Sequence, residues 1–323
     1  MNSNFNLTKE QLVRKPKSKS FYSKWGISLF LMCLPTIIYI FVFSYLPLGG
    51  LIIAFKDYNS FQGMWGSPWT AMGGFQHFYN FVTSPNFWVL VKNTLVLSIL
   101  SIVVNTVLPI IYALFLNEVK NKVSKKIIQL IMYAPYFIST VVLVGMLFVF
   151  FEADSGIFTR ILSVFGFDNS SQMENPDAFA AIYVISGVWQ GLGWWSIVYM
   201  GTLAAVDPNL HDAARIDGAG RFRRIFCINL PAIIPLAVIM FIMSIGNILN
   251  VGFEKVYLMQ LSTNLSSSEI ISTYVYRISF PTSGGIPQYS YATAIGLFNS
   301  IINIVILCIA NFVSKKVSNN SLW

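Results

Sequence analysis

A polar segment at residues 212–231, DAARIDGAGRFRRIFCINLP, lies between two long apolar segments and carries the clearest chemical pattern in the chain. The acidic Asp212 and the small Ala213 and Ala214 lie four to six residues before Gly218. Alanine side chains let another protein surface approach a helix closely, and glycine permits a turn or a close backbone contact. The pattern predicts a docking helix for a soluble partner, which is binding chemistry and not catalysis.

Local signals support a short helix at this position. Pro208 suits a first helical turn, and Asp207 or Asn209 can supply the N-cap. The charge of Asp212 is favourable near the N-terminal end of a helix dipole. Farther along, an apolar set is expected to face a partner while the arginines stay in water: Phe222, Ile225 and Phe226. The alternative is an ordinary amphipathic loop helix between two membrane spans.

Catalytic signals are missing from the sequence. It has no G-x-x-x-x-G-K-[ST] phosphate loop and no H-E-x-x-H pair. Its two histidines, His77 and His211, are expected to be surface or interfacial residues, and the three cysteines have neither disulfide nor metal-ligand spacing. We therefore expect no catalytic residue, no metal site and no ATP hydrolysis by this chain.

Composition indicates a membrane protein. Of the 323 residues, 55% are hydrophobic and 11% are charged, where a soluble domain has roughly 25% charged residues. A helix needs about 20 apolar residues to cross a bilayer. Six segments qualify, and they predict an all-α protein with six transmembrane helices: 27–46, 94–115, 127–151, 179–203, 232–250 running on to 258, and 291–313.

The net charge of +8 does not indicate a nucleic-acid partner, because Lys and Arg cluster beside the ends of the predicted spans. Most of them fall in residues 9–24, 120–126, 215–224 and 315–316. This distribution places both termini in the cytoplasm of a multi-pass protein in contact with membrane lipids. We expect a basic cytoplasmic arm at 1–24, a six-helix domain at 25–314 with a polar loop at 204–231, and a cytoplasmic tail at 315–323.

Polar side chains inside the predicted spans are candidates for a solute pathway. Ser244, Asn247, Asn250 and Glu254 follow one another at helical spacing, so we expect them on one face of the fifth helix. Carboxamides can donate to and accept from sugar hydroxyls, and aromatic rings can stack on a pyranose. The further candidates are Trp189, Gln190, Trp194, Asn299 and Asn303. The alternatives are hydrogen bonding between helices for the asparagines, packing for the tryptophans and simple solvation for Glu254.

The segment 212–231 resembles the cytoplasmic coupling loop of ABC importer permeases, E-A-A-x3-G-x9-I-x-L-P, with Asp212 in place of the usual Glu. The resemblance implies ATPase coupling by the matching positions and by three neighbours, Asp217, Ala219 and Phe222; the matching positions are Asp212, Ala213, Ala214, Gly218, Ile228, Leu230 and Pro231. Other segments resemble the permeases of complex-oligosaccharide importers of the aldouronate and alginate type: 54–59 (AFKDYN), 66–69 (GSPW), 250–254 (NVGFE), 273–277 (TYVYR), 289–294 (YSYATA) and 321–323 (SLW).

The resemblance implies the type I importer permease fold and an assembly in a bacterial cytoplasmic membrane. The expected partners are a second, related permease, two cytoplasmic ATPase subunits that bind ATP and magnesium, and an external lipid-anchored binding protein. The function that follows is import of an oligosaccharide by alternating access. Import of a peptide or amino acid, a stand-alone secondary transporter and a membrane-embedded regulatory protein remain alternatives at this point.

Overall fold

The computed structural model describes residues 24–166, 169–281 and 284–318. The arm at residues 1–23 and the end of the tail at 319–323 lie outside the described residues. Within them the chain is almost wholly helical, and the only extended pairing is a single antiparallel bridge between Lys56 and Trp69.

The helices, in chain order, are α1 Lys24–Ile40, η2 Phe41–Tyr45, η3 Leu46–Phe55, α2 Gly63–Gly66, η4 Met72–Gly74, α3 Gln76–Val82, α4 Phe87–Asn117, α5 Lys122–Tyr133, η5 Ala134–Phe137, α6 Thr140–Phe150, α7 Ile157–Val164, α8 Pro176–Ala204, α9 Pro208–Ile216, α10 Arg221–Arg224, η6 Ile225–Asn229, α11 Leu230–Ile245, α12 Phe253–Met259, α13 Leu265–Ser268, α14 Ile271–Ser279 and α15 Tyr289–Ser318. Here η2 and η6 are π-helical, and η3, η4 and η5 are 3-10 helices.

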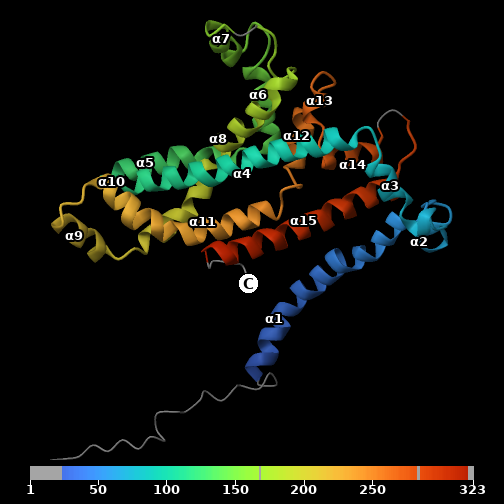
Figure 1. The fold of residues 1–323 in the computed structure, drawn as a ribbon, viewed down its shortest axis with the longest axis horizontal. Helices are drawn as coiled ribbons and strands as arrows, with labels where there is room; N and C mark the ends of the chain where they lie inside the picture. Colours follow the sequence, from blue (N-terminus) through green and yellow to red (C-terminus); the bar gives the residue numbers. More distant parts are fainter. Residues whose placement is uncertain (1–23, 167–168, 282–283, 319–323) are drawn as a thin grey trace, which may run out of the picture. The chain divides into compact units, whose positions relative to one another are not determined.

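The chain forms two compact units, residues 1–52 and residues 53–323. The described part of the first unit is one helical run with apolar residues on all sides, which continues through η2 into η3. In the second unit α4 and α8 make the most extensive helix pair, and α11 and α15 pack beside them. The short helices α9 and α10 lie at one end of this unit, and α3 and α14 lie at the other (Figure 1).

Four described helices are long and apolar enough to cross a membrane: Ile27–Phe55, Phe87–Asn117, Arg221–Ile245 and Tyr289–Lys316. A bent pair, Lys122–Phe137 and Thr140–Phe150, makes up to five. The predicted span at 179–203 lies in α8, a continuous helix of 29 residues whose Trp, Gly and Gln residues make it less apolar than the others. The helical membrane architecture is confirmed, and the count of six spans stays a prediction.

The predicted third span is wrong as a single helix. The chain bends by 97° between α5 and α6. Pro135 stands in the 3-10 turn η5, and Ser139 then caps the N-terminus of α6 by accepting from the Val142 N–H. Proline cannot donate to the helical ladder and clashes with the carbonyl one turn before it. We call residues 134–139 the elbow.

The predicted fifth span is also interrupted. Its helix α11 ends at Ile245, and α12 begins only at Phe253. The four polar residues expected on one helix face are therefore divided: Ser244 lies in α11, Asn247 and Asn250 lie in the break, and Glu254 lies in α12. The prediction of a single polar face is wrong. The cause is a non-helical stretch at 246–252, GNILNVG, whose two glycines and two asparagines interrupt the apolar segment.

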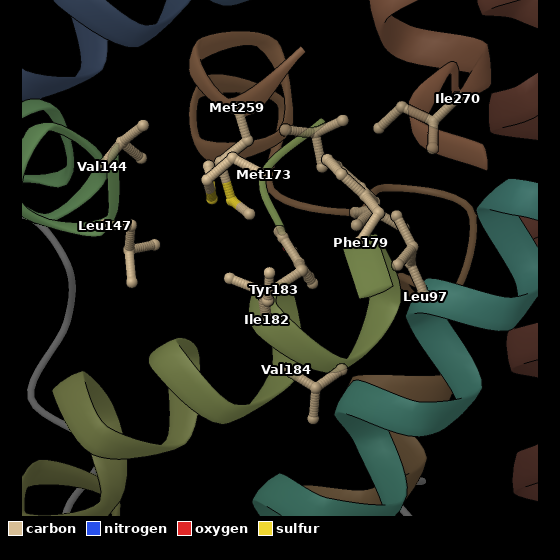
Figure 2. Close-up of a cluster of buried hydrophobic side chains, with 12 residues drawn as sticks. Leu97, Val144, Leu147, Met173, Phe179, Ile182, Tyr183, Val184, Met259 and Ile270 are labelled. Atoms are coloured by element: carbon tan, nitrogen blue, oxygen red, sulfur yellow. The ribbon is translucent and has the colours of Figure 1, made fainter. Parts of the chain in front are cut away.

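A buried apolar cluster holds α4, α6, α8 and α12 together. Figure 2 shows Met173 and Met259 between Val144 and Leu147 of α6 and Phe179 of α8. These side chains are almost fully buried, and Met259 is 0% exposed. The cluster fixes α12 and the segment before α8 against the bundle, despite the break that precedes α12.

Candidate functional site

The predicted docking helix exists as α9, and its start is confirmed. Asp207 is the N-cap, and its carboxylate accepts a hydrogen bond of 2.9 Å from the Asn209 N–H. Pro208 occupies the first turn, where its missing N–H costs nothing. An N-cap of this kind stabilises a short helix by about 1 kcal/mol.

Gly218 ends the helix in the left-handed conformation, with φ of +75°. The Ala219 N–H donates to the Ala214 carbonyl at 2.8 Å, and the Asp217 N–H donates to Ala213 at 3.0 Å. A Cβ added at Gly218 would meet nothing within 4 Å. The need for glycine here comes from the backbone angle alone, since other residues are strained at positive φ.

This loop exposes large apolar side chains to solvent. Ile216 is 87% exposed and Phe222 71%, and Phe226 and Leu210 are also more than half exposed. We call these four residues the apolar surface of the α9–α10 loop. Ile216, which is not among the predicted coupling residues, is the most exposed of the four. Asp212 forms an exposed ion pair with Arg215 at 2.8 Å, a kind of contact that contributes little stability.

The base of the loop is packed into the bundle. Ile225, which was predicted to face a partner, is buried against Tyr199 and Leu203 of α8, and the same cluster contains Ala113 of α4 and Ile233 of α11. The π-helix η6 holds Ile228, and α11 starts at Leu230 with Pro231 in its first turn. The base of the loop therefore packs against three helices, α4, α8 and α11.

Of the predicted pathway residues on α8, two contact the elbow. The Gln190 side-chain amide donates to the Ile138 carbonyl at 2.7 Å. Trp194, one turn later, stacks on Tyr136 with ring centroids 4.4 Å apart. Gly193 lets the chains approach this closely, because a Cβ there would lie 2.2 Å from the Met132 carbonyl oxygen. Trp189 points elsewhere and lines an apolar cavity of about 700 Å³ between α6, α7 and α8.

The asparagines of α15 bond the interrupted stretch at 246–252. Asn303 accepts from the Leu249 N–H at 3.1 Å, and Asn299 donates to the Asn250 side chain at 3.0 Å. From α4, the Ser98 hydroxyl donates to the Ile248 carbonyl. Non-helical backbone at membrane depth needs protein partners of this kind, so these bonds explain how the break is tolerated.

Asn247 and Glu254 have different surroundings. The Asn247 amide bonds only the Met243 carbonyl, 3.2 Å away in the preceding turn, and its side chain is exposed. Glu254 stands exposed in the first turn of α12. Its neighbour Lys255 is buried and donates to the Tyr183 carbonyl at 2.8 Å. The structure thus brings Asn250 and Asn299 together and leaves Asn247 and Glu254 accessible.

The described residues contain no cluster of three His, Cys, Asp or Glu side chains that could hold a metal ion. His77 lies 3.4 Å from the Asp57 carboxylate, and His211 stands on α9. At the α3–α14 end, Glu269 pairs with Arg277. Burial raises the pKa of the Glu269 carboxyl, and Arg277 opposes that shift.

Comparison with known proteins assigns this architecture. Residues 105–319 match the family described as the binding-protein-dependent transport system inner membrane component. The chain belongs to this family.

Two relatives from Bacillus subtilis (strain 168) match this permease over most of both lengths. Protein LplB is 40% identical over 93% of this chain and 91% of its own. The polygalacturonan/rhamnogalacturonan transport system permease protein YteP is 39% identical over 91% of this chain and 90% of its own.

A solved structure has the same fold. It is a bacterial alginate ABC transporter in complex with an alginate pentasaccharide-bound periplasmic protein. The match has a TM-score of 0.82 at 35% identity and covers 93% of this chain and 98% of that one. The permease therefore has the fold of an ABC importer translocation subunit and is a multi-pass protein of the cytoplasmic membrane, which disfavours a stand-alone secondary transporter.

Proposed function

We propose that this permease is the translocation subunit of an ATP-driven importer for an oligosaccharide or polysaccharide fragment, delivered outside the cell by a binding protein. The relatives named for polygalacturonan and rhamnogalacturonan transport, and the similar alginate transporter, support a saccharide substrate. A peptide or amino acid has no such support.

The assembly that fits this function contains a second related permease, two cytoplasmic ATPase subunits and an external lipid-anchored binding protein. ATP and magnesium belong to the ATPase subunits, and this chain contributes no catalytic residue. Both termini and the α9–α10 loop lie in the cytoplasm, as the clusters of Lys and Arg favour.

The observation that supports the mechanism is the apolar surface of the α9–α10 loop, which lies beside a capped helix. Water-exposed Ile216 and Phe222 are unfavourable in an isolated loop but suit the groove of a soluble partner. Closure of the ATPase pair around ATP pulls on α9 and α10, and buried Ile225 passes the movement to α4, α8 and α11. The translocation pathway between the two permeases then alternates between outward and inward access. Because only a difference in affinity can shift such an equilibrium, the loop must bind the two ATPase states differently.

The saccharide pathway is proposed along the polar and aromatic residues that the sequence indicated. Asn247 and Glu254 are accessible, and Asn250 and Trp189 have exposed side chains as well. Gln190, Trp194, Asn299 and Asn303 line the same pathway and also hold the elbow and the 246–252 stretch in place.

The test uses Gly218→Val in the purified complex reconstituted in proteoliposomes. At φ of +75° a β-branched residue is strained by about 1–2 kcal/mol, which moves Ile216 relative to Phe222. We expect ATP-dependent saccharide uptake to fall at least about tenfold while the complex still assembles. The matched control is Gly220→Ala, because Gly220 has φ of −65° and open space around its Cβ position. Normal uptake by the Gly218→Val complex would contradict the coupling role.

A further inference from the structure

Three helices of the permease enclose a cavity of about 170 Å³ within the bundle. Its walls are built by four pairs of residues, each pair one helical turn apart: Ser101 and Asn105 with Ile102 and Thr106 on α4, Trp195 and Tyr199 on α8, and Met240 and Ser244 on α11. Residues four apart lie on one face of a helix, so each helix turns a partly polar face to the same space. We call this cavity the polar chamber.

Some polar side chains of the chamber form no hydrogen bond with the described residues. Ser244 donates to the Met240 carbonyl within its own helix. In the described part of the chain, the Asn105 carboxamide and the Tyr199 hydroxyl have no hydrogen-bond partner, although Tyr199 is only 3% exposed. Neither group is among the fully enclosed unpartnered side-chain atoms of the described residues, so a carboxamide on α4 and a phenol on α8 border the chamber and are available to a polar ligand.

Size and charge define the ligand class. At about 30 Å³ per water molecule, 170 Å³ holds about six waters, which is roughly the size of one sugar ring. None of the described residues that line the chamber carries a charge at neutral pH. The chamber therefore suits hydroxyl groups, which both donate and accept, and it offers no counter-charge to a carboxylate. Trp195, 45% exposed, stands at its rim and offers a ring face for stacking.

We propose that the polar chamber is the subsite that holds one sugar ring of the transported saccharide through its hydroxyl groups, with Asn105 and Tyr199 as contact residues. This inference rests on the proposed saccharide import. It adds α4 and the second half of α8 to the pathway, and it assigns the chamber to the hydroxyl groups and not to the acidic groups of the substrate.

The decisive variant is Tyr199→Phe, which removes one hydroxyl and keeps the ring. Its matched control is Tyr112→Phe, because the Tyr112 hydroxyl on α4 is also unpartnered but is enclosed by protein and lines none of the described cavities. Uptake by the complete complex in proteoliposomes is measured with two probes, a galacturonate trisaccharide and the neutral maltotriose. For each probe that is imported, Tyr199→Phe and Asn105→Leu are expected to raise KM about tenfold, and Tyr112→Phe to leave it unchanged.

A second measurement reports the ligand directly. In a background with Cys33, Cys227 and Cys308 replaced by Ser, Asn105→Cys is expected to react with a water-soluble thiol reagent, and the imported probe is expected to slow this reaction at least fivefold. Val103→Cys, on the exposed side of the same helix, is the control and is expected to show no protection.

The outcomes separate the two proposals. Unchanged KM values and an unprotected thiol in a complex that imports a probe mean a water-filled chamber and overturn this inference alone. An unreactive thiol means that the chamber is filled by the second permease, which also overturns it. If the native complex imports neither probe in an ATP-dependent way, the proposed function is contradicted. The proposal that the chamber binds a sugar ring is then contradicted as well.

Discussion

Two groups of polar side chains lie within the helices of the 53–323 unit, and they differ in what they bond. Asn299 and Asn303 of α15 are buried and bond the interrupted stretch at 246–252. Asn105 of α4 and Tyr199 of α8 face a chamber and bond no described residue. The same residue type, asparagine in an apolar helix, thus serves structure in one place and remains available to a ligand in the other. The difference lies in whether neighbouring backbone is broken.

The largest expected effect is on stability, at Asn303. Replacing it with Leu leaves the Leu249 N–H unpaired in a buried position, which costs about 1–3 kcal/mol. We expect a clearly lower melting temperature of the purified complex in detergent. Asn247→Leu is the matched control, because that side chain is exposed and bonds only the Met243 carbonyl of the turn before it. Equal melting temperatures for the two variants would show that Asn303 does not stabilise the 246–252 stretch.

An intermediate effect is expected for the pair formed by Asn299 and Asn250. A double-mutant cycle with Asn299→Ala and Asn250→Ala should give a coupling energy of about 0.6–2 kcal/mol. The measurement is thermal or denaturant unfolding of the two single variants and the double variant. Strict additivity would show that the 3.0 Å contact contributes nothing to holding the break.

The smallest effect on stability is expected at the chamber. Asn105→Leu removes a carboxamide that bonds no described group, so its free energy of unfolding should change by less than about 0.5 kcal/mol. The same variant is expected to weaken uptake. A loss of stability as large as that of Asn303→Leu would place Asn105 with the structural group.

The α9–α10 loop shows which features of the candidate site could be predicted from the sequence. Asp207, Pro208 and Gly218 act through local backbone rules, namely capping, a fixed φ and a positive φ, so their roles could be predicted from residue type and spacing. Ile225 was placed on the wrong side, because its burial depends on α4 and α8, which come from far away in the sequence.

The breaks in the apolar segments were harder to predict. Mean hydropathy depends only on side-chain types and does not report where the backbone stops being helical. Residues 232–258 were therefore predicted to be one span, although α11 ends at Ile245. The compensating groups, Ser98 and Asn303, lie 150 and 54 residues from the atoms they bond. Only the fold brings them together, and for the same reason the chamber could not be predicted.

The elbow has a consequence for local opening. Helices α5 and α6 have 12 and 11 residues, so at about 1.5 Å per residue each is shorter than the ~30 Å hydrocarbon core. The first N–H groups of α6 have no carbonyl one turn before them, and the Ile138 carbonyl depends on Gln190 from another helix. Deuterium should therefore enter the amides of Thr140 and Val141 well before those in the middle of α4, which makes this corner the place where the bundle first admits solvent.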